Sequence, residues 1–258
     1  MAVIDPSARV DPAARLAADV QVGPYAVIGP HVEIGAATTV GAHAVITGHT
    51  RIGAGNRIFQ FVSLGEEPQH RAYHGEPTRL EIGDGNTIRE FCSIHRATTL
   101  EDGVTRVGND NLLMAYVHIA HDCKIGNGIT MANGASLAGH VRVGDYCVFG
   151  GFALVHQFVH IGTLAFIAYA CGVRRDVPAF VKCSDYAAKP HGINSVGMRR
   201  HGYGDDDIRI IKAAYRKLYR AKLSFDDARS AIQQLAAGYP AVTAMLESLD
   251  ASTRGIVR

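Results

Sequence analysis

The chain has 258 residues, of which 47% are hydrophobic, enough to bury the core of one large domain or of two unequal ones. Its formal charge of +2, with basic residues scattered along the chain, argues against binding to nucleic acid or to an anionic membrane. The sequence contains no run of about 18 apolar residues, so no membrane span is predicted. The N-terminus lacks the basic and apolar segments of a signal peptide. The five cysteines include no CxxC pair, so we expect reduced, structural thiols in a cytoplasmic protein.

A six-residue repeat dominates the sequence. From Ile4 to Leu64 an aliphatic residue recurs at every sixth position, eleven times in succession, and the register resumes at Ile82 and again at Val107. This period does not match an amphipathic helix, whose apolar face recurs at three and four residues. It matches a short strand followed by a tight turn, and three such units make a triangular coil of eighteen residues. We therefore predict a mainly β fold, a parallel β-helix of hexapeptide repeats over residues 1–185.

Two segments interrupt this register. Residues 65–81 place His70 and Glu76 where the repeat requires aliphatic residues, and thirteen positions separate Ile94 from Val107. We expect loops that leave the β-helix near 65–81 and 97–106. Long loops on a regular repeat fold often carry the binding site.

Helical patterns begin where the repeat ends, so residues 186–258 are predicted to form a C-terminal helical domain. Three aspartates at 205–207 favour a helix start through the helix dipole. Ser224 and Asp227 have the spacing of a capping box, and Pro240 suits the first turn of a third helix. We expect these helices to cap the exposed end of the β-helix.

The candidate active site follows from the length of one coil. His121, Gly139 and Gln157 are each eighteen residues apart, so they should share one corner of the β-helix, at steps of roughly 4.8 Å. Asp122 and His140 occupy the neighbouring column together with a phenylalanine, and other histidines flank the group. Polar residues are also expected at solvent-exposed turns without any function. The stacking of imidazole, carboxylate and bare backbone favours a functional site.

These residue types suit acyl transfer from a thioester to a hydroxyl group. A neutral imidazole can take the hydroxyl proton, which makes His121 the candidate general base. Asp122 could orient it, as in other His–Asp pairs. A glycine one coil away lets a carbonyl approach a backbone N–H, so Gly139 is the candidate oxyanion donor.

Five segments resemble the UDP-N-acetylglucosamine O-acyltransferases of lipid A biosynthesis: NLLMAYVHIAHDC (111–123), SLAGHV (136–141), VHQF (155–158), GEPTR (75–79) and STRGIVR (252–258). The similarity runs essentially from end to end. It implies a left-handed β-helix, a homotrimer and no cofactor or metal. It also implies transfer of a 3-hydroxyacyl chain from acyl carrier protein to the sugar 3-position of UDP-N-acetylglucosamine, with His121, Asp122 and Gly139 as catalytic residues. The substrate-binding residues that the resemblance implies are His118, His140, His156, Gln157, Asn194 and Arg200. We also place Gln69, His70 and His74 of the first loop among the candidate substrate-binding residues.

Several positions depart from the family pattern. Where members carry an aspartate and a lysine in the first loop, this chain has His70 and Ala72, and in the cap it has Val196 and His201 in place of a glutamate and an arginine. These changes affect acceptor recognition, so an acceptor with a 3-amino group in place of the 3-hydroxyl remains an alternative.

A length-selecting position is also implied by the resemblance. Members carry the residue that limits acyl length where this chain has Tyr169, with Phe166 nearby. A large side chain there predicts a short donor of about ten to twelve carbons, because overfilling a rigid apolar wall is costly. Tyr169 could instead fill a subunit interface.

Three other functions are compatible with the repeat. A histidine-rich trimer could bind zinc through His118, His121 and His140, but Asp122 and Gly139 are expected among them. The chain could be another hexapeptide acyltransferase, or a purely structural solenoid, which would leave the polar corner without a role.

Acidic acyl carrier protein could dock on either of two basic groups, Arg174, Arg175, Lys182, Arg199 and Arg200, or Arg216, Lys217, Arg220 and Lys222.

Overall fold

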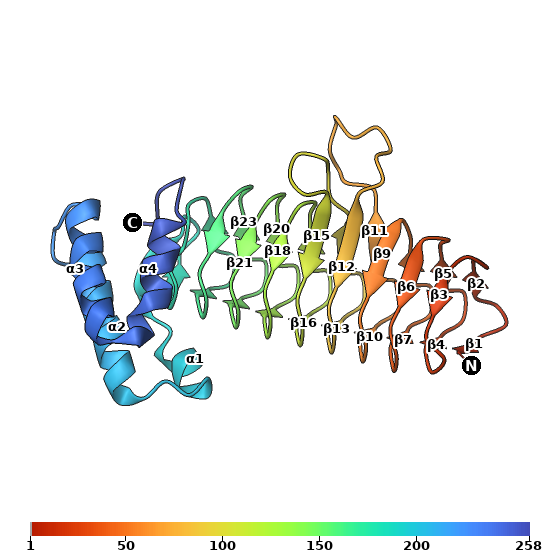
Figure 1. The fold of residues 1–258 in the computed structure, drawn as a ribbon, viewed down its shortest axis with the longest axis horizontal. Helices are drawn as coiled ribbons and strands as arrows, with labels where there is room; N and C mark the ends of the chain where they lie inside the picture. The colour runs from red at the N-terminus through yellow and green to blue at the C-terminus, as the bar shows by residue number, and fades with distance from the viewer. Residues whose placement is uncertain (1) are drawn as a thin grey trace.

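Three sheets, parallel except for the last strand β28, form the three sides of an elongated β-helix, described here from a computed structural model of residues 2–258 (Figure 1). The first sheet contains β1 (Val3–Ile4), β4 (Gln21–Val22), β7 (Thr39–Val40), β10 (Arg57–Ile58), β13 (Thr87–Ile88), β16 (Leu112–Leu113), β19 (Thr130–Met131), β22 (Val148–Phe149), β25 (Phe166–Ile167), β27 (Val181–Ser184) and β28 (Lys189–Ile193). The second contains β2 (Arg9–Val10), β5 (Val27–Ile28), β8 (Val45–Ile46), β11 (Ser63–Glu66), β14 (Ser93–His95), β17 (His118–Ile119), β20 (Ser136–Leu137), β23 (Leu154–Val155) and β26 (Gly172–Val173). The third contains β3 (Arg15–Leu16), β6 (Val32–Ile34), β9 (His49–Ile52), β12 (Arg79–Ile82), β15 (Val104–Val107), β18 (Lys124–Ile125), β21 (Arg142–Val143) and β24 (His160–Ile161).

The repeat aliphatics line the interior, as the six-residue spacing predicts. In β17 and β20, Ile119 pairs with Leu137, one coil of eighteen residues later, and both side chains are fully buried. Each such side chain contributes roughly 1.5–3 kcal/mol by leaving water. The ladder weakens at the open N-terminal end, where Ile4 is 42% exposed because no coil covers it. The predicted left-handed β-helix of hexapeptide repeats is confirmed.

Two insertions interrupt the coils near the middle of the chain. Leu80 pairs with Thr50, thirty positions earlier instead of eighteen, so this coil holds twelve extra residues. Thr105 pairs with Leu80 at a separation of twenty-five, which adds seven more. The resulting loops span residues 67–78 and 96–103, against the predicted 65–81 and 97–106. The strands extend into both ends of the first predicted loop and into the C-terminal end of the second, which itself begins one residue earlier than predicted. Both loops project from the same edge of the β-helix (Figure 1).

The C-terminal segment packs against the last coils and lies at the far end from the N-terminus (Figure 1). Its helices are α1 (Ser195–Arg200), α2 (Asp205–Tyr219), α3 (Phe225–Gly238), the 3-10 helix η1 (Pro240–Val242) and α4 (Thr243–Asp250). The predicted starts at Asp205, Ser224 and Pro240 are correct, and the Ser224 hydroxyl accepts the Asp227 N–H.

Helical structure begins later than the predicted residue 186. Residues 189–193 form β28, which pairs antiparallel with β27 and so extends the first sheet. Beyond it, Leu164 and Phe180 of the last coils form a second core with helical residues such as Met198 and Ile211. Within residues 2–258, no helix has the length and apolarity needed to cross a membrane.

All five cysteines are buried and unpaired. Burial raises the pKa of the thiols of Cys92, Cys123 and Cys147 to about 12. Such thiols remain protonated at neutral pH and are poor nucleophiles. The structural role predicted for them therefore agrees with their environment.

Candidate active site

His121, Gly139 and Gln157 follow one another along one corner of the β-helix, between the second and third sheets. Backbone hydrogen bonds join these coils, as when the His140 N–H donates to the His121 carbonyl at 3.0 Å and the Phe158 N–H to the Gly139 carbonyl at 3.1 Å. The eighteen-residue period therefore predicted this column correctly.

The next residue of each of these corners adopts a left-handed backbone conformation. Asp122, His140 and Phe158 have φ of 62°, 62° and 66°. The same conformation recurs at other corners, for example at Tyr116 and Tyr146, so it belongs to the turn and is no sign of local strain at the site. It stacks the His140 ring on the Phe158 ring, with centroids 4.5 Å apart.

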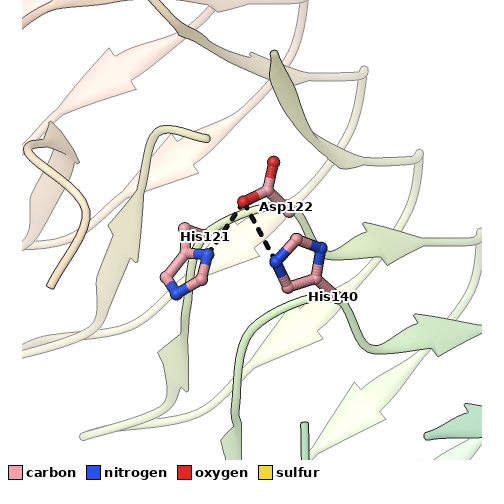
Figure 2. A group of neighbouring side chains, drawn as sticks. All are labelled: His121, Asp122 and His140. Carbon is pink, nitrogen blue, oxygen red and sulfur yellow. Dashed lines mark hydrogen bonds and ion pairs between the residues drawn. The ribbon is translucent and has the colours of Figure 1, made fainter. Parts of the chain in front are cut away.

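Asp122 is the centre of the cluster (Figure 2). Its Oδ2 lies 2.8 Å from Nδ1 of His121 and 3.6 Å from Nε2 of His140. Thr98 donates to the same carboxylate through its hydroxyl, at 2.7 Å, and through its backbone N–H. The Asp122 N–H itself donates to the hydroxyl of Thr105 at 2.8 Å. The three residues of Figure 2 are 6%, 1% and 2% exposed, so this polar group is almost completely enclosed.

The hydrogen bonds keep Asp122 ionised. Burial alone would raise the pKa of its carboxyl, but the hydrogen bonds from His121 and Thr98 outweigh burial and lower it. A carboxylate at this position accepts the Nδ1–H of His121 and leaves Nε2 of that ring as the basic nitrogen.

Gly139 is required by the position of the His121 ring. A Cβ on Gly139 would lie 2.5 Å from Cε1 and 2.8 Å from Nε2 of His121, well inside contact distance. The Gly139 N–H donates to no acceptor within residues 2–258. The backbone N–H groups of His121 and Gln157, at the same corner position, likewise donate to none there. A bare backbone donor therefore lies directly beside the imidazole.

The loop at 67–78 reaches this corner. The His70 ring meets the His121 ring edge-on, with centroids 5.3 Å apart, so the structure brings together two residues fifty-one positions apart. Arg96 holds the loop by donating to the Tyr73 hydroxyl at 2.7 Å and to the Gly65 carbonyl at 2.9 Å. Gln69 and His74 are exposed on the same loop.

His118 and His95 form a second imidazole pair beside the site, with centroids 5.1 Å apart. Nδ1 of His118 lies 2.8 Å from the Ser93 hydroxyl. Burial lowers the pKa of His118, and burial followed by the neighbouring His118 lowers the pKa of His95 to about 4. Both rings are therefore neutral at pH 7.

Other predicted substrate residues do not contact the cluster within the single chain. His156 is exposed, with Nδ1 3.2 Å from the Gln157 carbonyl, and Arg200 is exposed at the end of α1. Asn194 is buried and serves a structural role, because its side chain caps α1 at Gly197 and donates to the Leu164 carbonyl.

The predicted length-selecting residues lie on a different edge. Tyr169 is 81% exposed at a corner between the first and second sheets, whereas His121 lies between the second and third. Phe166 is half-buried in β25. The outward face of the second sheet, including Leu154 at 53% exposure, separates Tyr169 from the polar cluster.

Sequence reasoning missed the contribution of the loop at 96–103. It supplies Thr98 to Asp122, and it supplies Glu101, whose Oε1 lies 2.9 Å from Nδ1 of His140. No spacing rule could have found these residues, because the seven-residue insertion removes them from the coil register.

The arrangement differs from the zinc set considered above. The atoms that converge are Nδ1 of His121, Oδ2 of Asp122 and Nε2 of His140, all within 4.8 Å of one another, and His118 is bonded to Ser93 instead. The 2.8 Å separation between Nδ1 and Oδ2 is a hydrogen-bond distance, and Asp122 accepts further hydrogen bonds from Thr98. This chemistry fits proton transfer better than metal binding.

Known proteins resemble the chain over its full length. A family model described as UDP N-acetylglucosamine O-acyltransferase, domain 2, matches residues 176–257, and the bacterial transferase hexapeptide model matches 13–48 and 104–139. The acyl-[acyl-carrier-protein]–UDP-N-acetylglucosamine O-acyltransferases of Halorhodospira halophila and Alkalilimnicola ehrlichii are 57% and 52% identical over 258 residues, 100% of both chains in each case. The chain belongs to the UDP-N-acetylglucosamine O-acyltransferase family.

Solved structures of the UDP-N-acetylglucosamine O-acyltransferase family superpose closely. The Francisella novicida enzyme gives a TM-score of 0.98 at 39% identity, covering 99% of this chain and 94% of that one. The Acinetobacter baumannii protein gives 0.97 at 44% identity, covering 99% and 100%. The resemblance inferred from sequence motifs is thus confirmed, while the roles of individual residues stay predictions.

Proposed function

We propose that this chain transfers a 3-hydroxyacyl group from acyl carrier protein to the 3-hydroxyl of UDP-N-acetylglucosamine, the first step of lipid A biosynthesis. The observation that carries the proposal is the enclosed His121–Asp122 pair beside the bare Gly139 backbone, in a chain whose relatives are named for this transfer. An imidazole, a carboxylate and a free N–H are the groups that acyl transfer needs.

In the proposed mechanism His121 acts through Nε2. With Nδ1–H donated to Asp122, Nε2 removes the proton from the sugar hydroxyl while its oxygen attacks the thioester carbonyl carbon. The carbonyl oxygen becomes an oxyanion that accepts the Gly139 N–H. The intermediate then expels the thiolate, which takes the proton back from His121. The ester C–O bond forms, the C–S bond breaks, and the base is regenerated.

We further propose that the site is completed by a second copy in a homotrimer. His156, Arg200 and Tyr169 are exposed in the single chain although the resemblance assigns them to the substrate cleft. Packing of β-helices around a threefold axis would give three equivalent clefts at which such residues meet His121 from a neighbouring copy. Light scattering of the purified protein tests this assembly, and a fully active monomer would contradict it. A cytoplasmic location, where thiols stay reduced, remains a prediction.

The deciding experiment is an assay of purified protein with 3-hydroxyacyl carrier proteins of several chain lengths. UDP-N-acetylglucosamine and its 3-amino analogue are offered as separate acceptors. We expect turnover with the hydroxyl acceptor, and preference for the amine would transfer the proposal to that alternative. His121→Ala should lose about 10²–10⁴-fold in rate, the usual contribution of a general base. His43→Ala, an exposed histidine in a corner outside the site, is the matched control and should leave the rate unchanged. A folded His121→Ala variant with near-normal activity would remove His121 from the mechanism.

A further inference from the structure

Glu101 connects the loop at 96–103 to the polar cluster. Its Oε1 accepts the Nδ1–H of His140 at 2.9 Å, and its Oε2 accepts from Nη2 of Arg142 at 3.1 Å. The His140 side chain is 2% exposed and the Glu101 side chain 27%, so this contact is shielded from solvent at the imidazole end. The repeat pattern does not predict this contact, because Glu101 lies in the insertion between β14 and β15.

The contact determines which nitrogen of His140 carries its hydrogen. In its neutral form the His140 imidazole carries one N–H, and a carboxylate can only accept. With Nδ1–H given to Glu101, Nε2 of His140 has no hydrogen to donate to Asp122, although Oδ2 is 3.6 Å away. Nε2 is buried and has no hydrogen-bond partner within residues 2–258. Of the two imidazoles beside Asp122, only His121 then donates to Oδ2, which also accepts the Thr98 hydroxyl.

We propose that Glu101 is a positioning residue that holds His140 in the Nδ1–H tautomer and so reserves Asp122 for His121. The inference rests on the proposed function, because it assigns to Glu101 the tautomer on which the base depends. Without Glu101, the His140 hydrogen can move to Nε2 and compete with His121 for the same carboxylate oxygen. Pairwise contacts join the four side chains in the order Glu101, His140, Asp122 and His121.

Arg142 makes the isosteric substitution Glu101→Gln a sharp test. Arg142 can only donate, so it should hold the amide oxygen of the new side chain and turn the NH₂ group toward Nδ1 of His140. An NH₂ group donates where the carboxylate accepted, which reverses the tautomer to Nε2–H without changing side-chain size. Adding Arg142→Met frees the amide to rotate, so its oxygen can accept Nδ1–H again.

Two measurements on the full-length protein test the proposal. Long-range ¹H–¹⁵N correlation spectra of histidine-labelled protein report the tautomer of His140, with His140→Asn to assign the signal. We expect Nδ1–H in the wild type, Nε2–H in Glu101→Gln, and a return toward Nδ1–H in the double variant. In the acyltransfer assay, kcat should fall about tenfold in Glu101→Gln, with KM nearly unchanged, and recover at least partly in the double variant, because a misoriented base lowers the chemical step.

Asp102→Asn is the control for simple loosening of the loop. Asp102 lies beside Glu101 and pairs with Lys124 and Arg106, but it does not contact His140. It should leave kcat within about twofold of wild type, as expected for a partly exposed ion pair. Three results would each overturn the proposal: wild-type kcat in Glu101→Gln, an unchanged His140 tautomer, or a double variant no better than the single. The tautomer spectrum needs no turnover, so it separates failure of this inference from failure of the proposed acyl transfer.

Discussion

Substitution of Gly139 by alanine tests the geometry of the site most directly. The added Cβ would lie 2.5 Å from Cε1 and 2.8 Å from Nε2 of His121, whereas nonbonded carbon atoms prefer about 3.5–4.0 Å. The His121 ring therefore has to move away by about 1 Å, because the new Cβ is fixed to the turn backbone. Gly139 does not have a positive φ, so alanine meets no backbone strain and the ring is the main obstacle.

The expected loss of catalytic rate can be estimated from the displacement of the His121 ring. A misplacement of about 1 Å costs roughly 10²-fold in rate, equivalent to about 2.7 kcal/mol of activation free energy. Overpacking should also lower the free energy of unfolding by about 1–3 kcal/mol. Alanine keeps the backbone N–H, so this loss of rate would come from the displaced base and not from a missing oxyanion donor.

The assay compares kcat and thermal unfolding of Gly139→Ala with two further variants. Gly151→Ala is the matched control, since it occupies the same corner position one edge away and its Cβ would meet only the Asn133 carbonyl at 3.5 Å. In a His121→Ala background the Gly139 substitution should cost little more, because the displaced ring is gone. A folded Gly139→Ala variant with kcat within about threefold of wild type would refute the reasoning, since a 1 Å displacement should cost far more.

Three further predictions concern chain length, acid stability and the Asp122 environment. Tyr169→Gly should shift donor preference from about ten to twelve carbons toward longer chains, because the apolar wall recedes; an identical chain-length profile in both proteins would exclude Tyr169 as the limit. His95 has a pKa of about 4 in the folded protein, below the ordinary value near 6.5, so the unfolded chain binds the proton first and stability falls as the pH drops from about 6.5 to 4. Denaturant titrations should show a contribution of about 2–3 kcal/mol over that window that His95→Phe lacks, and an equally steep fall in the variant would contradict this origin. Thr98→Val removes the hydroxyl that donates to Asp122 at 2.7 Å, and should lower the free energy of unfolding by about 1.5–3 kcal/mol. An unchanged denaturation midpoint would contradict this prediction.

The sequence determined the β-helix and the column of the site because both depend on a local, repeated geometry. Every six residues make one strand and one turn, so the interior position of Ile119 and the alignment of His121 with Gly139 follow from counting. Helix starts at Asp205 and Ser224 were likewise predictable, since capping chemistry acts within one turn.

Contacts beyond that local geometry were decided only by the tertiary structure. The two insertions shift their residues out of register, so no spacing could place His70 against His121 or Glu101 against His140. Asn194 combines both cases, because its cap on the Gly197 N–H is local whereas its hydrogen bond to the Leu164 carbonyl joins a distant coil. Periodicity fixes what neighbouring coils repeat, whereas the polarity of an irregular loop does not reveal which buried atom its hydrogen bonds will satisfy.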